Sequence, residues 1–251
     1  MLELNSKTDD VKPAASIRRL NGSPVLNCIL RTAPEREFES LRPHLELQDL
    51  PSMRVLNEPG RPVANVYFLN SGFASLEIPT REGASVEVGT VGKDGFIGVP
   101  LLCGVKRTLL KSVIHIRGTG YRIKGEIFER ILQVAPQVRL RMKRYALLQG
   151  MQVAQIAACN RVHGLEKRLA RWLLDAADRV GLAIPITQEE LAEMLGTGRA
   201  SLSVVASRIR RSGTIQCVRG TIMILNRSRL EDLACECYAT VRGFRPELGL
   251  S

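Results

Sequence analysis

The spacing of apolar residues changes character along the first half of the chain. Residues 25–46 carry apolar side chains at helical spacing, from Val25 to Leu45, and Pro34 can open a second helix there. From 47 to 124 glycines become frequent and separate short runs rich in β-branched and aromatic residues. These runs predict strands at 65–69, 73–78, 85–91, 112–116 and 121–123.

Two of these predicted strands show the alternation of a sheet with one buried face. Leu76 and Ile78 on one strand, and Val86 and Val88 on the next, recur with a period of two. The connection between them carries Gly83, which is typical of a hairpin. Short strands separated by frequent turns predict a β-roll or jelly roll.

The next segment, residues 126–159, predicts helix, with Pro136 tolerated at the start of its long second part. Arg144 is the only charge on a heptad-like apolar seam, whose members are Leu140, Leu147, Met151, Ala154 and Ala158. Such a seam can pack against the chain's own roll or against a second copy. We expect a dimer, because the module that follows also favours one.

A third region predicts two short helices joined by a glycine turn. After an amphipathic helix at 163–180, Thr187 and Glu190 form an S/T-x-x-E capping box. Gly196 then allows a tight turn, and a second helix begins near Arg199. The inward residues of the two helices are Leu191, Met194, Leu195, Leu202, Val205, Ala206 and Ile209. This pattern predicts a helix-turn-helix.

The second of these helices is the predicted DNA-reading element. A following hairpin turns at Arg219–Gly220 and predicts a wing whose arginine contacts phosphate. The alternative is an ordinary helical hairpin in a core, which would not leave these arginines unopposed by any acid. The predicted DNA-contacting residues are Thr197, Arg199, Ala200, Ser201, Ser203, Val204, Ser207, Arg208, Arg211 and Arg219.

These elements predict an α+β chain: an N-terminal β-roll, a long dimerisation helix and a C-terminal winged helix-turn-helix. We expect a flexible tail at 1–24, a cyclic-nucleotide-binding-like sensor roll at 25–125, the dimerisation helix at 126–160, the DNA-binding domain at 161–240 and a second tail at 241–251.

Charge and composition narrow the class of partner. The chain of 251 residues has a formal net charge of +11, and seven arginines with no acid lie between Leu195 and Arg229. This bias favours a polyanion such as double-stranded DNA, although a generic basic surface would also explain it. No apolar run is long enough for a membrane helix, and the N-terminus has no secretory signal. We therefore expect a cytoplasmic protein without a membrane partner.

Cysteine and histidine placement argues against metal chemistry. The six cysteines are spread along the chain without C-x-x-C spacing, which predicts no disulfide framework, metal site or cofactor. A redox role for Cys235 and Cys237 stays open, but idle thiols are the simpler interpretation. A cupin-like enzyme needs a histidine-rich triad, and only His115 lies in the predicted roll. With no nucleophile elbow or P-loop either, we expect a protein that is not an enzyme.

The order of roll, long helix and winged helix-turn-helix resembles the Crp/Fnr family of bacterial transcription regulators. GKDGFIGVPLLCG at 92–104, CNRVHGLEKRLARWLL at 159–174 and the helix-turn-helix with its wing carry the resemblance. It implies a homodimer on a near-palindromic site, with RNA polymerase as a further partner. Arg199 matches the family's guanine-reading arginine and Ser201 a phosphate-contacting hydroxyl. Ala200 and Val204 replace base-reading residues, so the operator should differ from that of the cyclic AMP receptor protein.

The same resemblance places an effector pocket at Gly95, Phe96, Ile97, Gly98, Arg107 and Lys111. Nucleotide-binding relatives carry a glutamate after the F-x-G turn and an arginine about ten residues later. Here Val99 and Pro100 follow the turn, and Lys111 is the nearest basic equivalent, without the planar fork of arginine. We expect a roll that does not bind a cyclic nucleotide; an unknown small-molecule effector and a vestigial scaffold that senses nothing both stay open. A cyclic-nucleotide-responsive regulator and an architectural DNA-binding protein without ligand input are the alternatives.

Overall fold

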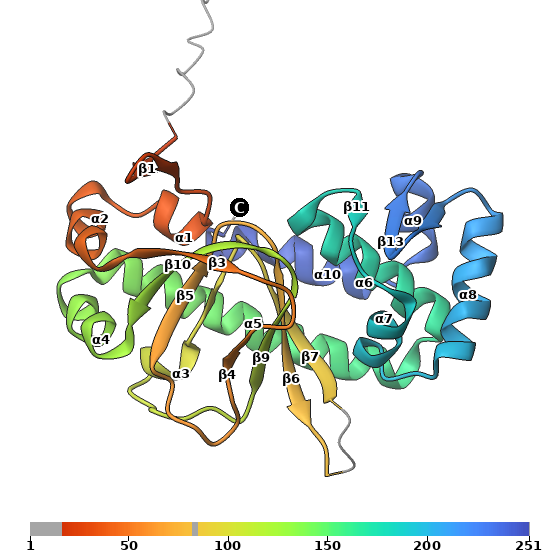
Figure 1. The fold of residues 1–251 in the computed structure, drawn as a ribbon, viewed down its shortest axis with the longest axis horizontal. Helices are drawn as coiled ribbons and strands as arrows, with labels where there is room; N and C mark the ends of the chain where they lie inside the picture. Colours follow the sequence, from red (N-terminus) through yellow and green to blue (C-terminus); the bar gives the residue numbers. More distant parts are fainter. Residues whose placement is uncertain (1–16, 82–84, 251) are drawn as a thin grey trace, which may run out of the picture.

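The computed structural model describes residues 17–81 and 85–250 and has two lobes (Figure 1). The N-terminal lobe is a β-roll, and the C-terminal lobe is mostly helical with a small sheet. Helix α5 (Pro136–Val162) runs from one lobe to the other. No helix in the described part of the chain is long and apolar enough to cross a membrane.

The roll consists of two four-stranded sheets in which every neighbouring pair is antiparallel. The first has the order β3 (Glu46–Leu50), β10 (Gly118–Lys124), β5 (Asn65–Leu69), β8 (Phe96–Ile97). The second has the order β4 (Val55–Asn57), β9 (Lys111–Ile116), β6 (Phe73–Pro79), β7 (Ser85–Val91). The five predicted strands are confirmed. The burial predicted from the alternation of apolar residues is partly wrong, however. Ile78 is 47% exposed, whereas Glu87 is buried because a helix of the other lobe covers it.

The segment predicted as helix before the roll is shorter and more broken than expected. It contains α1 (Cys28–Arg31), α2 (Glu35–Leu41) and the 3-10 turn η1 (Arg42–His44), and β3 has already begun at residue 46. Before it, the part of the expected tail that the structure describes forms a small hairpin, β1 (Arg19–Leu20) with β2 (Ser23–Pro24). The rest of that tail, up to residue 16, lies outside the described residues.

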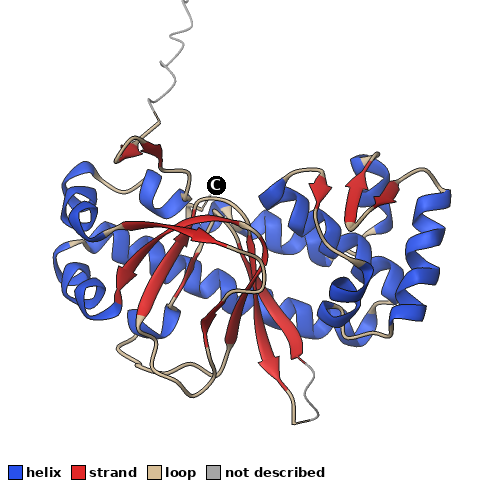
Figure 2. Ribbon diagram, in the orientation of Figure 1, coloured by secondary structure: helices blue, strands red, loops and turns tan. Residues whose placement is uncertain are grey.

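Helices dominate the second half of the chain (Figure 2). Helix α4 (Gly125–Val134) ends before Ala135, because a residue that precedes proline disfavours helical backbone, and α5 begins at Pro136. The short helix α3 (Val99–Leu102) follows β8 in the roll. The remaining elements are α6 (Leu165–Val180), β11 (Ala183–Ile184), α7 (Gln188–Met194), α8 (Arg199–Arg211), β12 (Ile215–Val218), β13 (Thr221–Ile224) and α9 (Arg227–Leu233).

The C-terminal segment is not the tail that the sequence predicts. Helix α10 (Cys237–Phe244) and the 3-10 turn η2 (Pro246–Leu248) pack against α5. Leu248 is buried in the core of the roll, and Leu250 is buried beside it. Arg245 Nη1 pairs with Asp94 Oδ2 at 2.6 Å. The sequence does not predict this packing, because the segment has too few apolar residues to show a helical repeat. The surface on which these residues pack is formed by segments that are distant in the sequence.

Candidate DNA-binding surface

The start of α7 and the turn before α8 are stabilised by hydrogen bonds between residues that are close in the sequence. The Thr187 hydroxyl accepts from the backbone N–H of Glu190 at 3.2 Å, and the Glu190 carboxylate accepts from the Thr187 N–H at 2.8 Å. Gly196 has φ +58°, and the next N–H, of Thr197, bonds back to the Ala192 carbonyl at 2.9 Å. The predicted capping box and glycine turn are confirmed.

Helix α8 presents one apolar face to the lobe and a polar face to solvent. Leu202, Ala206 and Ile209 are buried, and Val205 is partly buried against the same core. The helix lies at the outer edge of its lobe, away from the roll (Figure 1). The predicted DNA-contacting residues of α8 are all at least partly exposed: Arg199, Ala200, Ser201, Ser203, Val204, Ser207, Arg208 and Arg211. Their contact with DNA stays a prediction.

Two of the α8 arginines do have acidic neighbours, contrary to the sequence-based expectation. Arg199 Nη1 lies 3.7 Å from Glu189 Oε2, and Arg208 Nη1 lies 3.3 Å from Glu166 Oε2. The acids come from α7 and α6, which only the tertiary fold brings near. Both pairs are solvent-exposed, so each contributes about 0–1 kcal/mol and yields readily to a phosphate or base. Arg210 is also exposed, and sequence reasoning passed over it although it belongs to the same arginine run.

The predicted wing is confirmed. Strands β12 and β13 pair antiparallel, and the two turn residues Arg219 and Gly220 have φ +44° and +76°. Positive φ at both central residues is typical of the tight hairpin turn that matches strand twist. Arg219 is exposed at the tip, and no carboxylate of residues 17–81 or 85–250 lies within ion-pair distance of it. A helix-turn-helix followed by such a hairpin defines a winged-helix DNA-binding fold.

Helix α6 holds this module against the roll through a junction that mixes apolar and polar contacts. The Trp172 ring packs edge-on against Phe73 at 5.5 Å between centroids, and its indole N–H donates to Glu87 Oε1 at 3.0 Å. Beside them, the Thr90 hydroxyl donates to Asp175 Oδ2 at 2.8 Å. These partners come from β6, β7 and α6, so the junction fixes how the DNA-binding module sits on the roll.

A buried ion cluster closes the same junction. Asp94, in the turn before β8, contacts Arg179 of α6 at 3.4 Å and Arg245 after α10 at 2.6 Å. Burial opposes ionisation of Asp94, but the two guanidinium groups hold its pKa well below its usual range. Asp175 also pairs with Arg179, at 2.6 Å. The cluster joins the roll, α6 and the C-terminal segment, and Asp94 is its central member, because removing this carboxylate would take an ion-pair partner from both Arg179 and Arg245.

Glu87 makes the junction sensitive to pH. Burial raises its pKa to about 8, although the charge of Arg171 and the Trp172 hydrogen bond lower it. The folded protein therefore holds a proton that the unfolded chain releases above its ordinary pKa near 4.5. This contribution to stability falls as pH rises from about 4.5 to about 8 and is level above that.

Glu87→Gln is therefore expected to raise stability at pH 8 by up to about 4 kcal/mol, with little change at pH 4.5. Glutamine keeps an oxygen for the Trp172 N–H and has no proton to lose. Thermal unfolding of both proteins across this pH range measures the difference. Glu77→Gln is the matched control: burial would raise the pKa of Glu77, but His115 and Ser75 lower it, so its removal should bring no gain. A pH-independent difference for Glu87→Gln would contradict the assignment.

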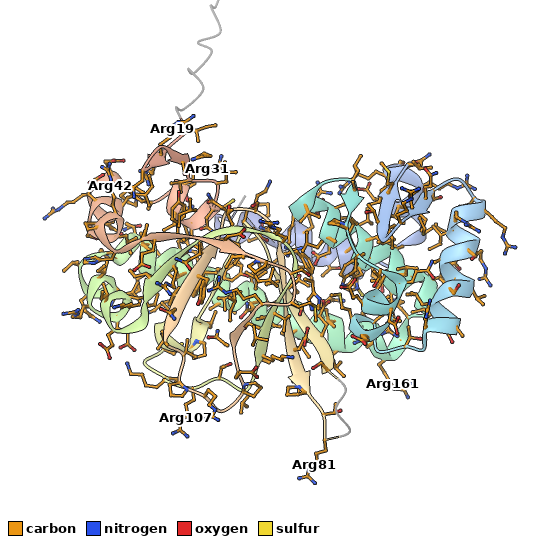
Figure 3. All side chains as sticks on the ribbon, in the orientation of Figure 1. Arg19, Arg31, Arg42, Arg81, Arg107 and Arg161 are labelled. Carbon is orange, nitrogen blue, oxygen red and sulfur yellow. The ribbon has the colours of Figure 1, made fainter. Side chains whose placement is uncertain are left out.

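The residues predicted to hold an effector do not converge on one pocket. Gly95 lies beneath the Tyr145 ring, so close that a Cβ there would stand 2.0 Å from Tyr145 Cζ. Phe96 is buried and packs against the same ring, with centroids 5.4 Å apart. Arg107 is exposed at the edge of the roll (Figure 3), and Lys111 pairs in register with Glu77 on β6. Aromatic side chains fill the place where the resemblance puts a ligand.

A cavity of about 470 Å³ lies elsewhere, between the roll, α5, α6 and α10. Its lining is rich in charged and amide groups, including Gln149, Gln152, Asp175 and Arg242, and includes none of the predicted effector residues.

The predicted dimer seam is exposed along α5. Leu140, Leu147 and Met151 are 43%, 53% and 40% exposed, and Ala154 and Ala158 are exposed beside them. The opposite face of the helix is buried against the chain's own core through Val138, Met142, Tyr145, Leu148 and Ile156. The helix therefore has two apolar faces, and the chain itself covers one of them.

One cluster contradicts the argument that the cysteines are too scattered to form a ligand set. Cys159 and His163, at the end of α5, meet Cys235, which lies in the link from α9 to α10, and Cys237, the first residue of α10. Burial and the neighbouring Cys159 thiol raise the pKa of Cys235 to about 12. Only the C-x-C and C-x-x-x-H spacings hinted at this group, because its halves lie more than 70 residues apart.

Comparisons with known proteins agree with this architecture. Residues 167–233 match the Crp-like helix-turn-helix domain family. No curated protein sequence matches the chain significantly. The c-di-GMP-responsive global regulator CLP of Xanthomonas campestris has a similar structure, with a TM-score of 0.63 and 16% identity over 76% of this chain and 99% of CLP.

Two further solved structures are similar to a comparable degree. A CRP-family transcriptional regulator from Thermus thermophilus has a TM-score of 0.61 and 19% identity, over 74% of this chain and 96% of its own. FixK2 from Bradyrhizobium japonicum has a TM-score of 0.61 and 14% identity, over 76% and 98%. The chain therefore carries a Crp-like helix-turn-helix domain and has the fold of the Crp/Fnr transcription regulators. These comparisons agree with the expectation of a regulator rather than an enzyme.

Proposed function

We propose that this protein is a cytoplasmic transcription regulator that binds DNA as a homodimer and reads a near-palindromic site with α8. The observation that carries the proposal is the outward face of α8, with Arg199 at its N-terminal end and the Arg219 wing beside it. An arginine there can make a bidentate contact to guanine in the major groove, while Arg219 contacts phosphate. RNA polymerase is the expected further partner.

The seam on α5 supports the homodimer. A second copy presents the same apolar strip. If the two α5 helices packed side by side about a two-fold axis, each strip would cover the other. Gly150, Ala154 and Ala158 leave room for the two backbones to approach closely, since no atom lies within 4 Å of the space a Cβ at Gly150 would take. Dimerisation would place two α8 helices about 34 Å apart, in successive major grooves.

The packing of the roll supports a regulator that does not respond to cyclic nucleotides. Tyr145 and Phe96 fill the space above the glycine turn, Arg107 is exposed, and Lys111 faces a carboxylate instead of a ligand phosphate. Val99 and Pro100 offer no carboxylate for a ribose hydroxyl. An effector of other chemistry, or none, fits this roll better.

Genome-wide capture of DNA fragments by the purified protein tests the proposal. Enriched fragments should share a two-fold symmetric motif whose half-sites lie about 10 base pairs apart, centre to centre. Repeating the capture with cell-metabolite extract, and separately with cyclic AMP and cyclic GMP, reveals whether any small molecule changes the enrichment. Retention of fragments without a shared motif would support the architectural alternative and contradict a sequence-specific regulator.

A further inference from the structure

Three buried cysteines and a histidine converge at the point where the long helix ends. Cys159 and His163 lie one turn apart on α5, and His163 caps that helix. Cys235 lies in the link between α9 and α10, and Cys237 is the first residue of α10. The four ligand atoms lie within 4.8 Å of one another. All three cysteines are at most 4% exposed and are free thiols.

The separations between the donor atoms agree with a tetrahedral metal site. Cys159 Sγ lies 3.5 Å from Cys235 Sγ, and Cys237 Sγ lies 3.6 Å from His163 Nδ1. A tetrahedral zinc ion, with Zn–S of about 2.3 Å and Zn–N of about 2.0 Å, separates two sulfurs by roughly 3.8 Å and sulfur from nitrogen by roughly 3.5 Å. Small shifts of the side chains would therefore seat the ion.

The surroundings of the cluster orient its donor atoms. The other ring nitrogen of His163, Nε2, lies 3.3 Å from Glu236 Oε1, which leaves Nδ1 facing Cys237. Gln155 Nε2 donates to Cys237 Sγ at 3.1 Å, a contact suited to a thiolate. A carboxylate behind a ligating histidine is a recurrent support of zinc sites, because it fixes the ring and raises the basicity of the ligand.

We propose that Cys159, His163, Cys235 and Cys237 bind one zinc ion per chain. Three thiolates and one imidazole form a closed set of four protein ligands, which is typical of structural zinc and unlike the oxygen-rich sites of magnesium or calcium. Each ligating thiol releases its proton to solvent as the metal binds, and no electron is transferred.

The position of the site gives the metal a mechanical role. Gly164 separates α5 from α6, so the ion lies beside the junction between the dimerisation helix and the DNA-binding module. Helix α10 lies beside α5 between the two lobes (Figure 1) and is joined to the module through α9. A metal shared by these segments fastens the end of α5 to the C-terminal helices. If the protein is the DNA-binding regulator proposed above, zinc then helps to fix the position of each DNA-binding module on α5, and so the spacing of the two α8 helices in the dimer.

The test begins with the metal content of the full chain purified under reducing conditions. Elemental mass spectrometry should find one zinc per chain, and replacement by Co²⁺ should give the absorption of a tetrahedral cobalt–thiolate centre. Cys235→Ser and Cys159→Ser should lose this stoichiometry. Cys217→Ser, which removes a half-buried thiol on β12 outside the cluster, should keep it.

A milder variant guards against loss of folding. Glu236 is 72% exposed at its side chain, so Glu236→Gln should fold normally and still weaken zinc about 10- to 100-fold in competition with a chromogenic chelator. Removing zinc should lower the affinity of wild-type protein for its operator by about tenfold, a usual size of coupling between sites.

Four outcomes would overturn the proposal: no zinc retained against the chelator, iron with acid-labile sulfide in its place, a Cys159–Cys235 disulfide in the reduced preparation, or equal zinc loss in Cys217→Ser. Zinc content and cobalt spectra are measured without DNA, so they stand or fall independently of the proposed function.

Discussion

Met151→Glu is expected to turn the dimer into monomers and to abolish tight operator binding. Met151 lies in the middle of the exposed seam of α5, between Leu147 and Ala154. In a two-fold interface each new carboxylate would face its symmetry mate among apolar side chains, about two helical turns from Arg144, the one charge on the seam. Burying such an unpaired charge costs several kcal/mol, and the cost is counted twice in a symmetric dimer.

Loss of the dimer should also weaken DNA binding, because a monomer has one α8 and can contact only one half-site. Sedimentation velocity measures the assembly, and titration of a labelled operator measures binding. Leu109→Glu is the matched control, since Leu109 is 84% exposed in the loop before β9 and does not belong to the α5 seam, so the same substitution there should leave both measurements unchanged. A stable dimer of the Met151→Glu protein would show that the interface lies elsewhere.

The parts of the structure that the sequence predicts are those with local causes. Thr187 and Glu190 are three residues apart and cap each other, so the start of α7 could be recognised without knowing what surrounds it. The two-residue turn at Arg219–Gly220 likewise carries its own conformational preference. Strands β5 to β7 were recognisable because their apolar residues cluster between turn residues.

The parts that the sequence does not predict depend on contacts between distant segments. Glu87 interrupts an apolar strand, and only the arrival of Trp172 from α6 explains why a carboxyl group is buried there. The sequence around Leu248 does not indicate that this residue belongs to the core of the roll, because its burial depends on the packing of the C-terminal segment against α5. The cysteines show the same limit, since Cys159 and Cys235 meet across 76 residues. Spacing rules detect ligands that lie close together in sequence, and this cluster is made of two pairs.

Arg199→Ala is expected to remove sequence selectivity while leaving non-specific DNA binding nearly intact. Arg199 is the first residue of α8, and its guanidinium lies beside Glu189 in the free protein. On binding, it would exchange this weak exposed pair for a bidentate contact to guanine O6 and N7. That contact is worth about 1–3 kcal/mol in each half-site, so the dimer should lose roughly twice as much on its operator.

Two companion variants separate base reading from phosphate contact. Arg199→Lys keeps the charge but loses the planar fork, so it should lose selectivity nearly as fully as Arg199→Ala. Arg219→Ala should instead weaken operator and random DNA alike, and should lower the slope of log K against log salt by about 0.9 for each phosphate that the variant no longer neutralises. Competition titrations on both DNAs over a range of salt concentrations measure all three proteins. Equal losses on operator and random DNA for Arg199→Ala, with full rescue by lysine, would make Arg199 a phosphate contact and would move the reading of bases to residues further along α8.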